Sequence, residues 1–348
     1  MSEGVQLVDP AGSENWDARI QEFEGATFFH SLAWLNVLVK AYGYAPSYVL
    51  AGPAKQPRGV LPLVEVNSWL TGRRGVSLPF TDECQPLLSA GHQGEFECIW
   101  NSVLAHGRTR KWRYVECRGG GDHFPSGSAA VSFYGHKLDL IPGESALFEG
   151  LNSSVRRAIR KAEKSSLSLA VDTTGRDLKL FYELLCLTRK KHGLPPQPFS
   201  FFRRISKEIL AVNRGCIVSA RLNGRPVAAS MYFYAGRSVI YKYGASDERL
   251  QDLRGSNLVM WEAIRWFIQK GFQNLDFGRT SLTNEGLRRF KLGWGTREKR
   301  IDYFRFNFRT NQFVKTPDEA EGWHNAVFRM LPLRLSRLAG EILYRHVA

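Results

Sequence analysis

The sequence predicts a mixed α/β fold (α+β, with mixed sheets) made of two related units. The chain has 348 residues, which is about twice a common single-domain length. Short β-branched runs between Gly and Pro turns alternate with segments of helical periodicity. Both halves also contain a strand, a basic turn and a second strand, around Pro57-Arg58-Gly59 and around Gly224-Arg225-Pro226. Since the similarity lies in the order of elements, we expect two tandem domains of related architecture.

The first half contains one mixed α/β unit. Apolar residues recur with helical spacing in two segments, and runs of β-branched residues between Pro and Gly mark the strands. The predicted elements are a helix over 31–40, strands over 47–51 and 59–66, a helix over 95–106, and strands over 113–117 and 137–140.

The pattern starts again after Gly150, and Asn223-Gly224 predicts a hairpin turn while Gly271 ends a long helix. The predicted elements are helices over 155–164, 178–192 and 201–210, strands over 216–222, 226–234 and 238–243, a helix over 256–270, a strand over 274–277, a helix over 284–292 and a strand over 300–308. We therefore predict an N-terminal domain over 1–150, a C-terminal domain over 151–315 and a helical tail over 316–348.

The composition is that of an ordinary globular protein. Hydrophobic residues make up 43% of the chain and charged residues 23%, and no run approaches the roughly eighteen apolar residues of a membrane helix. The N-terminus has no apolar region typical of a signal peptide, so we expect a cytoplasmic protein. The five cysteines are scattered, without metal-ligand spacing, and we predict free thiols and no metal site.

The net charge of +15 favours partners that carry phosphates, such as a phosphorylated substrate, a nucleic acid or an anionic membrane. The sequence has no zinc finger, no aromatic RNA-binding motif and no Walker A loop, so a DNA-reading module has no support. A basic enzyme with a phosphate-bearing substrate fits the composition best.

A basic helix follows Asn152. At 100° per residue, its cationic side chains, among them Arg160 and Lys161, share one face, while Val155, Ile159 and other apolar residues lie opposite. This face is either a contact surface for phosphate or RNA, or a solvated face that keeps the protein soluble.

A second candidate phosphate site is Arg254-Gly255-Ser256, at the start of a predicted apolar helix. Free amides at a helix N-terminus beside a glycine attract anions. The usual coenzyme A signature, Gln/Arg-x-x-Gly-x-Gly/Ala, is not met from Gln251, because Arg254 occupies its first glycine position. The alternative is a simple helix start.

The most informative segment runs from Asn274 to Gly295. A strand ends in Asp-Phe-Gly-Arg, and a polar loop leads to a short helix with Phe-Lys-Leu-Gly-Trp-Gly. This segment resembles the FemAB-related acyltransferases, which have a strand ending in Asp-Phe-Gly and a later Phe-Lys-x-Gly-Phe/Trp-Gly motif. The Arg-Arg-x-Ile-Arg-Lys-Ala run after Asn152 and Leu-Pro-Phe-Thr-Asp at 78–82 are further similarities.

The resemblance implies two tandem domains of the GNAT (GCN5-related N-acetyltransferase) fold and the transfer of an acyl or aminoacyl group to an amine. It assigns the family's catalytic lysine to Lys291, which would stabilise a tetrahedral intermediate. Phe290 would position it. A structural alternative for Lys291 is a lysine favoured by the helix dipole.

The other positions follow with less specific roles. Asp276 would orient the amine or accept its proton, and the alternative is an ion pair with Arg279, which we predict on the substrate side. Asp82 corresponds to a substrate-side position in the first domain.

One departure concerns the donor. Family members that use charged tRNA often carry a long helical hairpin, and no such heptad pattern occurs here, so we predict no coiled-coil arm. The shorter form resembles the FemAB-like proteins of PEP-CTERM/exosortase and exopolysaccharide systems. The donor is either an aminoacyl-tRNA or an acyl-CoA, with no permanently bound cofactor, and the acceptor is an amine of an envelope, peptidoglycan or exopolysaccharide precursor.

Two alternative functions stay open from the sequence. One is an acyl-CoA-dependent N-acetyltransferase of a small amine or sugar. The other is a non-catalytic basic protein that binds RNA or anionic lipid with a steep salt dependence.

The tail from Trp323 to Ala348 contains an amphipathic helix. Leu331, Leu335, Leu338 and Ile342 follow helical spacing among several arginines. Such a helix either lies on the inner membrane face or packs against the body of the protein.

Overall fold

The computed structural model describes residues 4–318 and 324–347, so Trp323 and Ala348 of the predicted tail lie outside the described residues. The chain forms two compact units, and neither is one continuous piece of chain. The first unit is Met1–Phe133, Arg300–Asp318 and Leu343–Ala348, and the second is Tyr134–Lys299 and Glu319–Ile342. The domain limits predicted at 150 and 315 do not coincide with these units, because strand β15 (Arg297–Asn307) returns to the first one. As domain limits they stay predictions.

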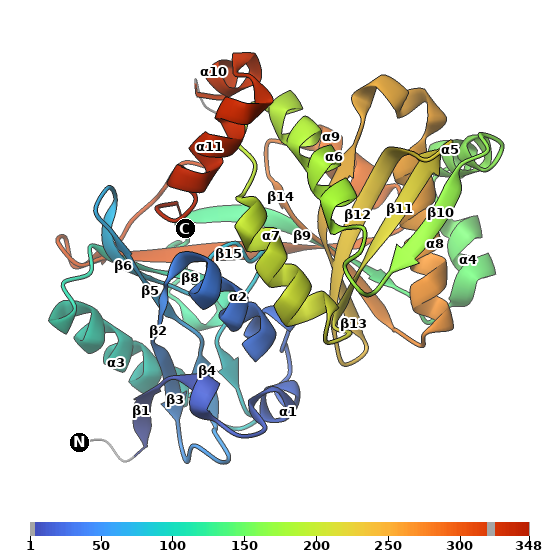
Figure 1. The fold of residues 1–348 in the computed structure, drawn as a ribbon. Coiled ribbons are helices and arrows are strands. Elements are labelled where there is room, and N and C mark those ends of the chain that lie inside the picture. Colours follow the sequence, from blue (N-terminus) through green and yellow to red (C-terminus); the bar gives the residue numbers. More distant parts are fainter. Residues whose placement is uncertain (1–3, 319–323, 348) are drawn as a thin grey trace. The chain divides into compact units, whose positions relative to one another are not determined.

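The first unit combines helices with strands (Figure 1). Its elements are β1 (Val5–Val8), α1 (Trp16–Gln21), α2 (Leu32–Tyr42), β2 (Ala45–Pro46), β3 (Tyr48–Ala51), β4 (Gly59–Leu61), β5 (Val64–Ser68), β6 (Gly72–Val76), β7 (Leu87–Leu88), α3 (Glu95–Thr109), β8 (Tyr114–Arg118), the start of β9 (Val131–Asp139), most of β15, and β16 (Gln312–Phe313). Ser31 caps α2, since its side chain accepts from Trp34 N, and Gly43 ends the helix in a left-handed conformation.

The strands of the first unit belong to two sheets. One has the antiparallel order β1-β3-β4-β7, and α3 packs against its first three strands. In the other, β15 pairs with β8, β8 with β6 in parallel, β6 with β5 and β5 with β2. The strand predicted over 59–66 is therefore wrong as a single element. It is two strands in different sheets, separated at Pro62, which cannot donate a ladder hydrogen bond.

The second unit has strands of one sheet with helices packed on them (Figure 1). Its elements are the end of β9, α4 (Gly143–Gly150), α5 (Ser153–Glu163), β10 (Ser168–Asp172), α6 (Leu178–Lys191), α7 (Phe199–Ile205), the π-helical turn η4 (Ser206–Leu210), β11 (Gly215–Leu222), β12 (Arg225–Ala235), β13 (Ser238–Ser246), the 3-10 segment η5 (Glu248–Leu253), α8 (Gly255–Gln269), β14 (Asn274–Ser281), α9 (Glu285–Leu292), α10 (His324–Met330) and α11 (Leu333–Leu343). Its strand order is β10-β11-β12-β13-β14-β9.

The core of the second unit lies between its sheet and the helices α5 and α8. Trp261, Ile264 and Phe267 of α8 are buried against this sheet, and Val155 and Ile159 of α5 join the same cluster. This confirms the predicted apolar face of the basic helix, which Asn152 caps through its side chain. The sequence did not predict α4 or β10, and the helix predicted over 201–210 changes to a π-helical turn halfway.

The antiparallel pairs β3–β4 and β11–β12 confirm the strand–turn–strand units predicted in both halves. The longest helices of the described chain, α3 and α8, have 15 residues each. Within residues 4–318 and 324–347, no helix has both the length and the apolar character needed to cross a membrane.

Candidate active site

The candidate site of the second unit begins where two parallel strands separate. Strands β13 and β14 pair only from Ser238 with Asn274 to Ile240 with Asp276. Beyond that point β13 continues to Ser246 and β14 to Ser281. The two strands therefore diverge over more than half of their length, and the divergent part of β14 begins directly after Asp276, within the Asp-Phe-Gly-Arg motif.

A kink in β14 brings two backbone carbonyls together. Gly278 has a φ of 70°, which lies in the left-handed region that glycine adopts easily. Asp276 supports this conformation, because its Oδ1 accepts a 2.7 Å hydrogen bond from the Gly278 amide. The carbonyls of Gly278 and Arg279 both accept from Lys291 Nζ, at 2.8 and 2.9 Å. Successive carbonyls of a regular strand point in opposite directions, so the kink is what lets one ammonium bind both.

Lys291 is a buried cation, with 3% of its surface exposed. The two carbonyls of β14 hold its ammonium group. Its charge reaches His136 of β9: burial, followed by the charges of Lys291 and Arg288 and opposed by Glu298, lowers the pKa of His136 from 6.5 to about 4. His136 is 1% exposed, and neither of its ring nitrogens has a hydrogen-bond partner among the described residues. The imidazole beside Lys291 is therefore neutral at neutral pH.

Helix α9 is fixed by an ion pair on its other side. Arg288 donates to both carboxylate oxygens of Glu298, at 2.8 and 3.0 Å, and its guanidinium lies 4.2 Å from the ring centre of Tyr134. Asn284 caps the helix by accepting from the Leu287 amide. These contacts define the position of the Phe290-Lys291 pair.

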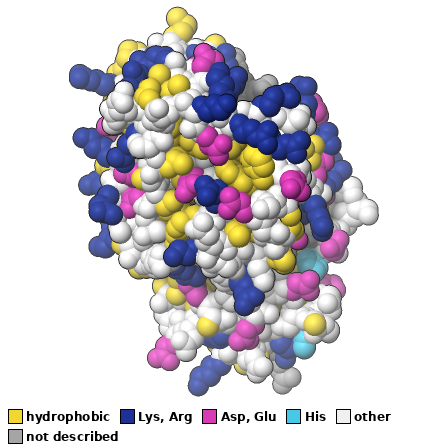
Figure 2. All heavy atoms as spheres, turned by 90° about the vertical axis from the view of Figure 1, so that its right-hand side faces the viewer, with side chains coloured by type: hydrophobic (Ala, Val, Ile, Leu, Met, Phe, Trp, Pro, Cys, Tyr) yellow, Lys and Arg dark blue, Asp and Glu magenta, His cyan; other side chains and the backbone are white. Residues whose placement is uncertain are grey.

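A basic pocket of about 910 Å³ lies beside Phe290, between α5, α8 and α9. Four of its lining residues are cations, and none is acidic: they are Arg157 and Lys161 of α5, Arg254 before α8, and Arg289 of α9. Asn257 adds a neutral amide. The face of this unit that carries α4 and α5 also shows many Lys and Arg side chains (Figure 2). Four cations without an acidic partner in the pocket favour a ligand with phosphate groups.

The structure brings some of the predicted substrate-binding residues together and separates others. Lys161, Arg254 and Phe290 share the basic pocket. Arg160 lies outside it: its guanidinium sits 5.5 Å from the ring centre of Phe148, beside a separate hollow, because consecutive helical residues point about 100° apart.

The two residues after Arg254 do not line the basic pocket. Gly255 is buried, and a Cβ there would lie 2.7 Å from Val227 Cγ1, so this glycine allows α8 to start close to β12. Ser256 is exposed in the first turn of the helix. Arg254 itself has a φ of 56° and precedes the helix in a left-handed conformation, which places its side chain at the pocket.

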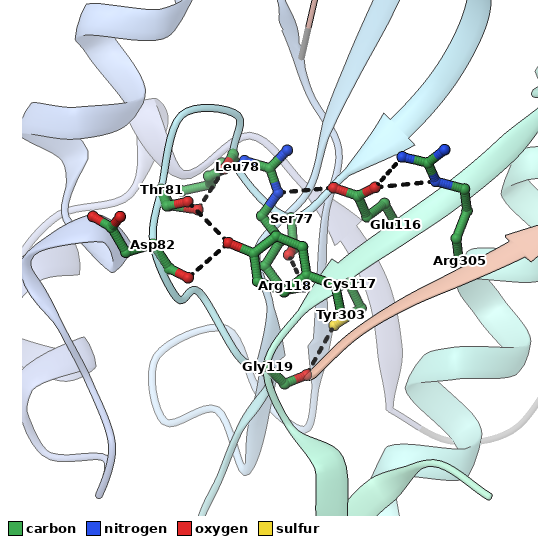
Figure 3. Close-up of polar contacts among 10 residues, drawn as sticks. All are labelled: Ser77, Leu78, Thr81, Asp82, Glu116, Cys117, Arg118, Gly119, Tyr303 and Arg305. Atoms are coloured by element: carbon green, nitrogen blue, oxygen red, sulfur yellow. Dashed lines mark hydrogen bonds and ion pairs between the residues drawn. The ribbon is translucent and has the colours of Figure 1, made fainter. Parts of the chain in front are cut away.

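In the first unit, Asp82 lies in a fixed loop after β6. Two residues of this loop, Leu78 and Phe80, have left-handed backbone conformations (φ of 52° and 61°) although neither is glycine. Such conformations cost about 1–3 kcal/mol each and persist only where the surroundings enforce them. The Tyr303 hydroxyl donates to the carbonyls of Thr81 and Asp82, at 3.2 and 2.7 Å, and the Asp82 carboxylate points away from these bonds (Figure 3).

A buried charge network stands behind this loop (Figure 3). Glu116 pairs with Arg118 at 2.9 Å and with Arg305 at 2.6 Å, and Arg118 also donates to the Leu78 carbonyl. Burial alone would raise the pKa of Glu116, but the two guanidinium groups lower it, so the carboxylate is charged. The Glu116 carboxylate has a guanidinium partner on each side, and Arg118 links it to the Leu78 carbonyl. This network therefore holds the strained loop in place.

Some residues of the site were not predicted from the sequence. Arg289 had no predicted role, and only the fold places it in one pocket with Arg157 of the basic helix, more than 130 positions away. His136 is a single histidine in a strand, and no spacing marks it. Among the described residues, no group of three or more His, Cys, Asp or Glu side chains is arranged to hold a metal ion.

The comparisons with known proteins agree with this geometry. Residues 151–303 match a family model described as an acetyltransferase (GNAT) domain. No curated protein sequence matches the chain significantly. Among solved structures, FemX is similar with a TM-score of 0.67 at 13% identity, over 86% of this chain and 96% of that chain.

Two further structures share the fold. A tandem GNAT protein from the clavulanic acid biosynthesis pathway is similar with a TM-score of 0.56 at 10% identity, over 87% of this chain and 98% of that one. The C-terminal domain of a putative lysylphosphatidylglycerol synthetase from Agrobacterium fabrum gives 0.55 at 10% identity, over 89% and 92%. At these identities the likeness concerns the fold.

The family match and the fold together define an acyltransferase with two GNAT-like domains. This confirms the predicted fold class and enzyme class. The chain shares its fold with FemX and with the C-terminal domain of a putative lysylphosphatidylglycerol synthetase.

Proposed function

We propose that this enzyme transfers an acyl or aminoacyl group from a phosphate-bearing donor to an amine of a cell-envelope precursor. The observation that carries the proposal is the basic pocket beside Phe290, with Arg157, Lys161, Arg254 and Arg289 on its walls. Its volume of about 910 Å³ is in the range of small-molecule sites. It is large enough for a nucleotide with its phosphates, and both aminoacyl-tRNA and acyl-CoA end in such a group.

Lys291 is proposed to act on the transferred acyl group. When an amine attacks the acyl carbonyl, negative charge develops on the carbonyl oxygen, and a preorganised cation near it lowers the barrier. Lys291 is next to Phe290 in α9, and its ammonium group donates to two carbonyls of β14. Asp276 then has a positioning role, because it supports the Gly278 kink that Lys291 binds.

The acceptor is proposed to bind at the Asp82 loop of the first unit. A carboxylate attracts a protonated amine, and the Glu116 network and Tyr303 fix the loop that carries it. The peptidoglycan, exopolysaccharide and PEP-CTERM/exosortase contexts rest on the sequence motifs alone. Arg279, half-buried at the divergent end of β14, is proposed to contact substrate.

A second candidate function has support from the family model. Because residues 151–303 match an acetyltransferase domain, transfer from acyl-CoA to a small amine or sugar is the alternative to aminoacyl transfer from tRNA. The same match favours an enzyme over the non-catalytic binding protein considered from the sequence. Both enzymatic functions use the basic pocket, and they differ in the donor that fills it.

The pocket assignment is tested with the variant Lys161→Ser/Arg254→Ser. Each lost charge-assisted hydrogen bond is worth about 1.5–3 kcal/mol, so the donor KM or Kd should rise by more than tenfold per residue. Arg160→Ser is the matched control, because Arg160 neighbours Lys161 but lies outside the pocket. The assignment fails if the control weakens donor binding as much as the double variant does.

A further inference from the structure

Helix α11 packs against the second unit through its small residues. Ser336 and Gly340 are buried, and a Cβ on Gly340 would lie 2.0 Å from the Pro196 carbonyl oxygen. Nearby, the Arg337 guanidinium lies 4.9 Å from the ring centre of Tyr182 on α6. These contacts fix which side of α11 faces the protein.

The opposite side of α11 is apolar and uncovered. At 100° per residue, Leu335, Leu338 and Ile342 lie on the side opposite Ser336 and Gly340. Their exposed fractions are 51%, 52% and 54%. In helix α10, which precedes α11 in the chain, the exposed fractions of Val327 and Met330 are 48% and 85%. An amphipathic helix that packs on its protein normally buries its leucines, and here the reverse holds. The helix therefore packs on the body, as one of the two alternatives from the sequence predicts, but its apolar face is exposed.

Basic side chains accompany this apolar face. Arg329 of α10 and Arg334 of α11 are exposed. Arg329 also lines a pocket of about 470 Å³ together with Lys190 and Lys191 from the end of α6. Lys191 pairs with Glu248 in this pocket. Arg329 and Lys190 have no ion pair among the described residues.

Cations beside this pocket act on a neighbouring histidine. Burial, and then the charges of Lys191, Arg189 and Arg329, lower the pKa of His192, which is part of the same pocket, and Glu248 opposes them. The cations of α6 and α10 therefore act together on this part of the surface.

We propose that α10 and α11 form a docking surface for an anionic lipid bilayer. The exposed apolar side chains would enter the boundary between headgroups and acyl chains, while Arg329, Arg334 and Lys190 contact headgroup phosphates. A second copy of this chain fits less well, because a symmetric contact through this face would bring the same cations together. This docking surface is independent of the proposed transfer reaction, because vesicle binding can be measured without any acyl transfer.

The test is flotation of the full chain with two kinds of vesicle. Vesicles that contain phosphatidylglycerol should carry the protein, and vesicles of phosphatidylcholine alone should not. Leu335→Ser/Leu338→Ser/Ile342→Ser should weaken the binding about tenfold or more, since burial of each CH₂ contributes about 0.8 kcal/mol. Arg329→Ser/Arg334→Ser should weaken it about fivefold per charge. The substituted side chains are exposed, so the midpoint of thermal unfolding should stay the same.

Matched controls separate the proposal from general stickiness. Ile141 and Val212 are exposed apolar residues of the same unit, outside α10 and α11, so Ile141→Ser/Val212→Ser should bind vesicles normally. Arg204→Ser/Lys207→Ser removes two exposed charges and should also have little effect. Controls that lose as much binding as the α10–α11 variants would overturn the proposal.

Three further outcomes would also overturn it. One is the absence of binding to phosphatidylglycerol vesicles at low ionic strength. Another is release from the vesicles by soluble glycerol phosphate, which would indicate a site for free phosphate. The third is a triple variant that changes the molar mass from dimer to monomer in sedimentation equilibrium, which would assign the face to a second copy.

Discussion

Replacement of Lys291 by methionine separates a catalytic charge from a structural contact. Met keeps the chain length and burial of Lys291, but it removes the charge and both hydrogen bonds to the carbonyls of Gly278 and Arg279. Each buried carbonyl left without its donor costs about 1–3 kcal/mol, so we expect the free energy of unfolding to fall by about 2–6 kcal/mol. A chain in the middle of the ordinary range of stability, about 5–15 kcal/mol, stays folded.

The expected effect of Lys291→Met on catalysis is larger than its effect on folding. Removal of one oxyanion-stabilising group typically lowers kcat by about 10²–10³. Turnover is measured below the onset of unfolding, with circular dichroism to confirm that the variant is folded. Thr296→Val is the matched control, because it removes a buried 3.0 Å hydrogen bond to the Lys291 carbonyl without a change of charge.

Two results would refute this reasoning. Lys291→Met with turnover within a few-fold of the parent would make the lysine a structural residue of α9 that only holds the kink of β14. A Thr296→Val variant with an equal loss would show that disturbance of α9, and not the charge of Lys291, lowers the rate.

Two further predictions concern His136 and the Asp82 loop. The pKa of His136 is lowered from 6.5 to about 4, so between these pH values the unfolded chain binds a proton that the folded chain does not. The neutral, buried His136 therefore contributes fully to the free energy of unfolding above pH 6.5. This contribution, up to about 3 kcal/mol, is lost as the pH falls toward 4. Between neutral pH and about pH 4.5, the unfolding midpoint of His136→Phe should therefore fall less than that of the parent protein. Burial also lowers the pKa of His30 to about 4, but His30 is present in both proteins and affects them equally. Identical pH profiles of the two proteins would contradict the prediction. Tyr303→Phe removes the hydrogen bonds to Thr81 and Asp82 and should raise the acceptor KM while leaving the donor KM unchanged. Tyr234→Phe, which loses comparable bonds in the other unit, should change neither constant, and a raised donor KM in Tyr303→Phe would place the loop outside acceptor binding.

The regular elements around the site follow from local sequence rules. Asn152 and Asn284 cap α5 and α9, and the apolar side of the basic helix is buried as its periodicity predicts. The strand limits were harder to predict. β14 continues four residues past Phe277, because its pairing and the Gly278 kink depend on neighbouring strands and on Lys291.

The grouping of site residues depends on tertiary structure. Arg160 and Lys161 are adjacent and both cationic, yet only Lys161 lines the pocket. The rotation of α5 about its axis, set by its packing on α8, decides which of the two side chains faces the pocket. Gly255 looks like part of an anion site in the sequence, but its contact with Val227 gives it a packing role. The strained conformations of Leu78 and Phe80 have no sequence marker, because the Glu116 network that enforces them comes from other strands.

The central claim is that a phosphate-bearing donor fills the basic pocket and gives its acyl group to an amine. The direct measurement is a donor screen, in which aminoacyl-tRNA and a panel of acyl-CoAs are each incubated with the enzyme and candidate amine acceptors, and the acceptor is weighed by mass spectrometry. The account predicts that one donor class adds its acyl mass to an acceptor amine, and that Lys161→Ser/Arg254→Ser greatly reduces this transfer while Arg160→Ser does not. Transfer that the double variant performs as fast as the parent enzyme, at donor concentrations below KM, would contradict it.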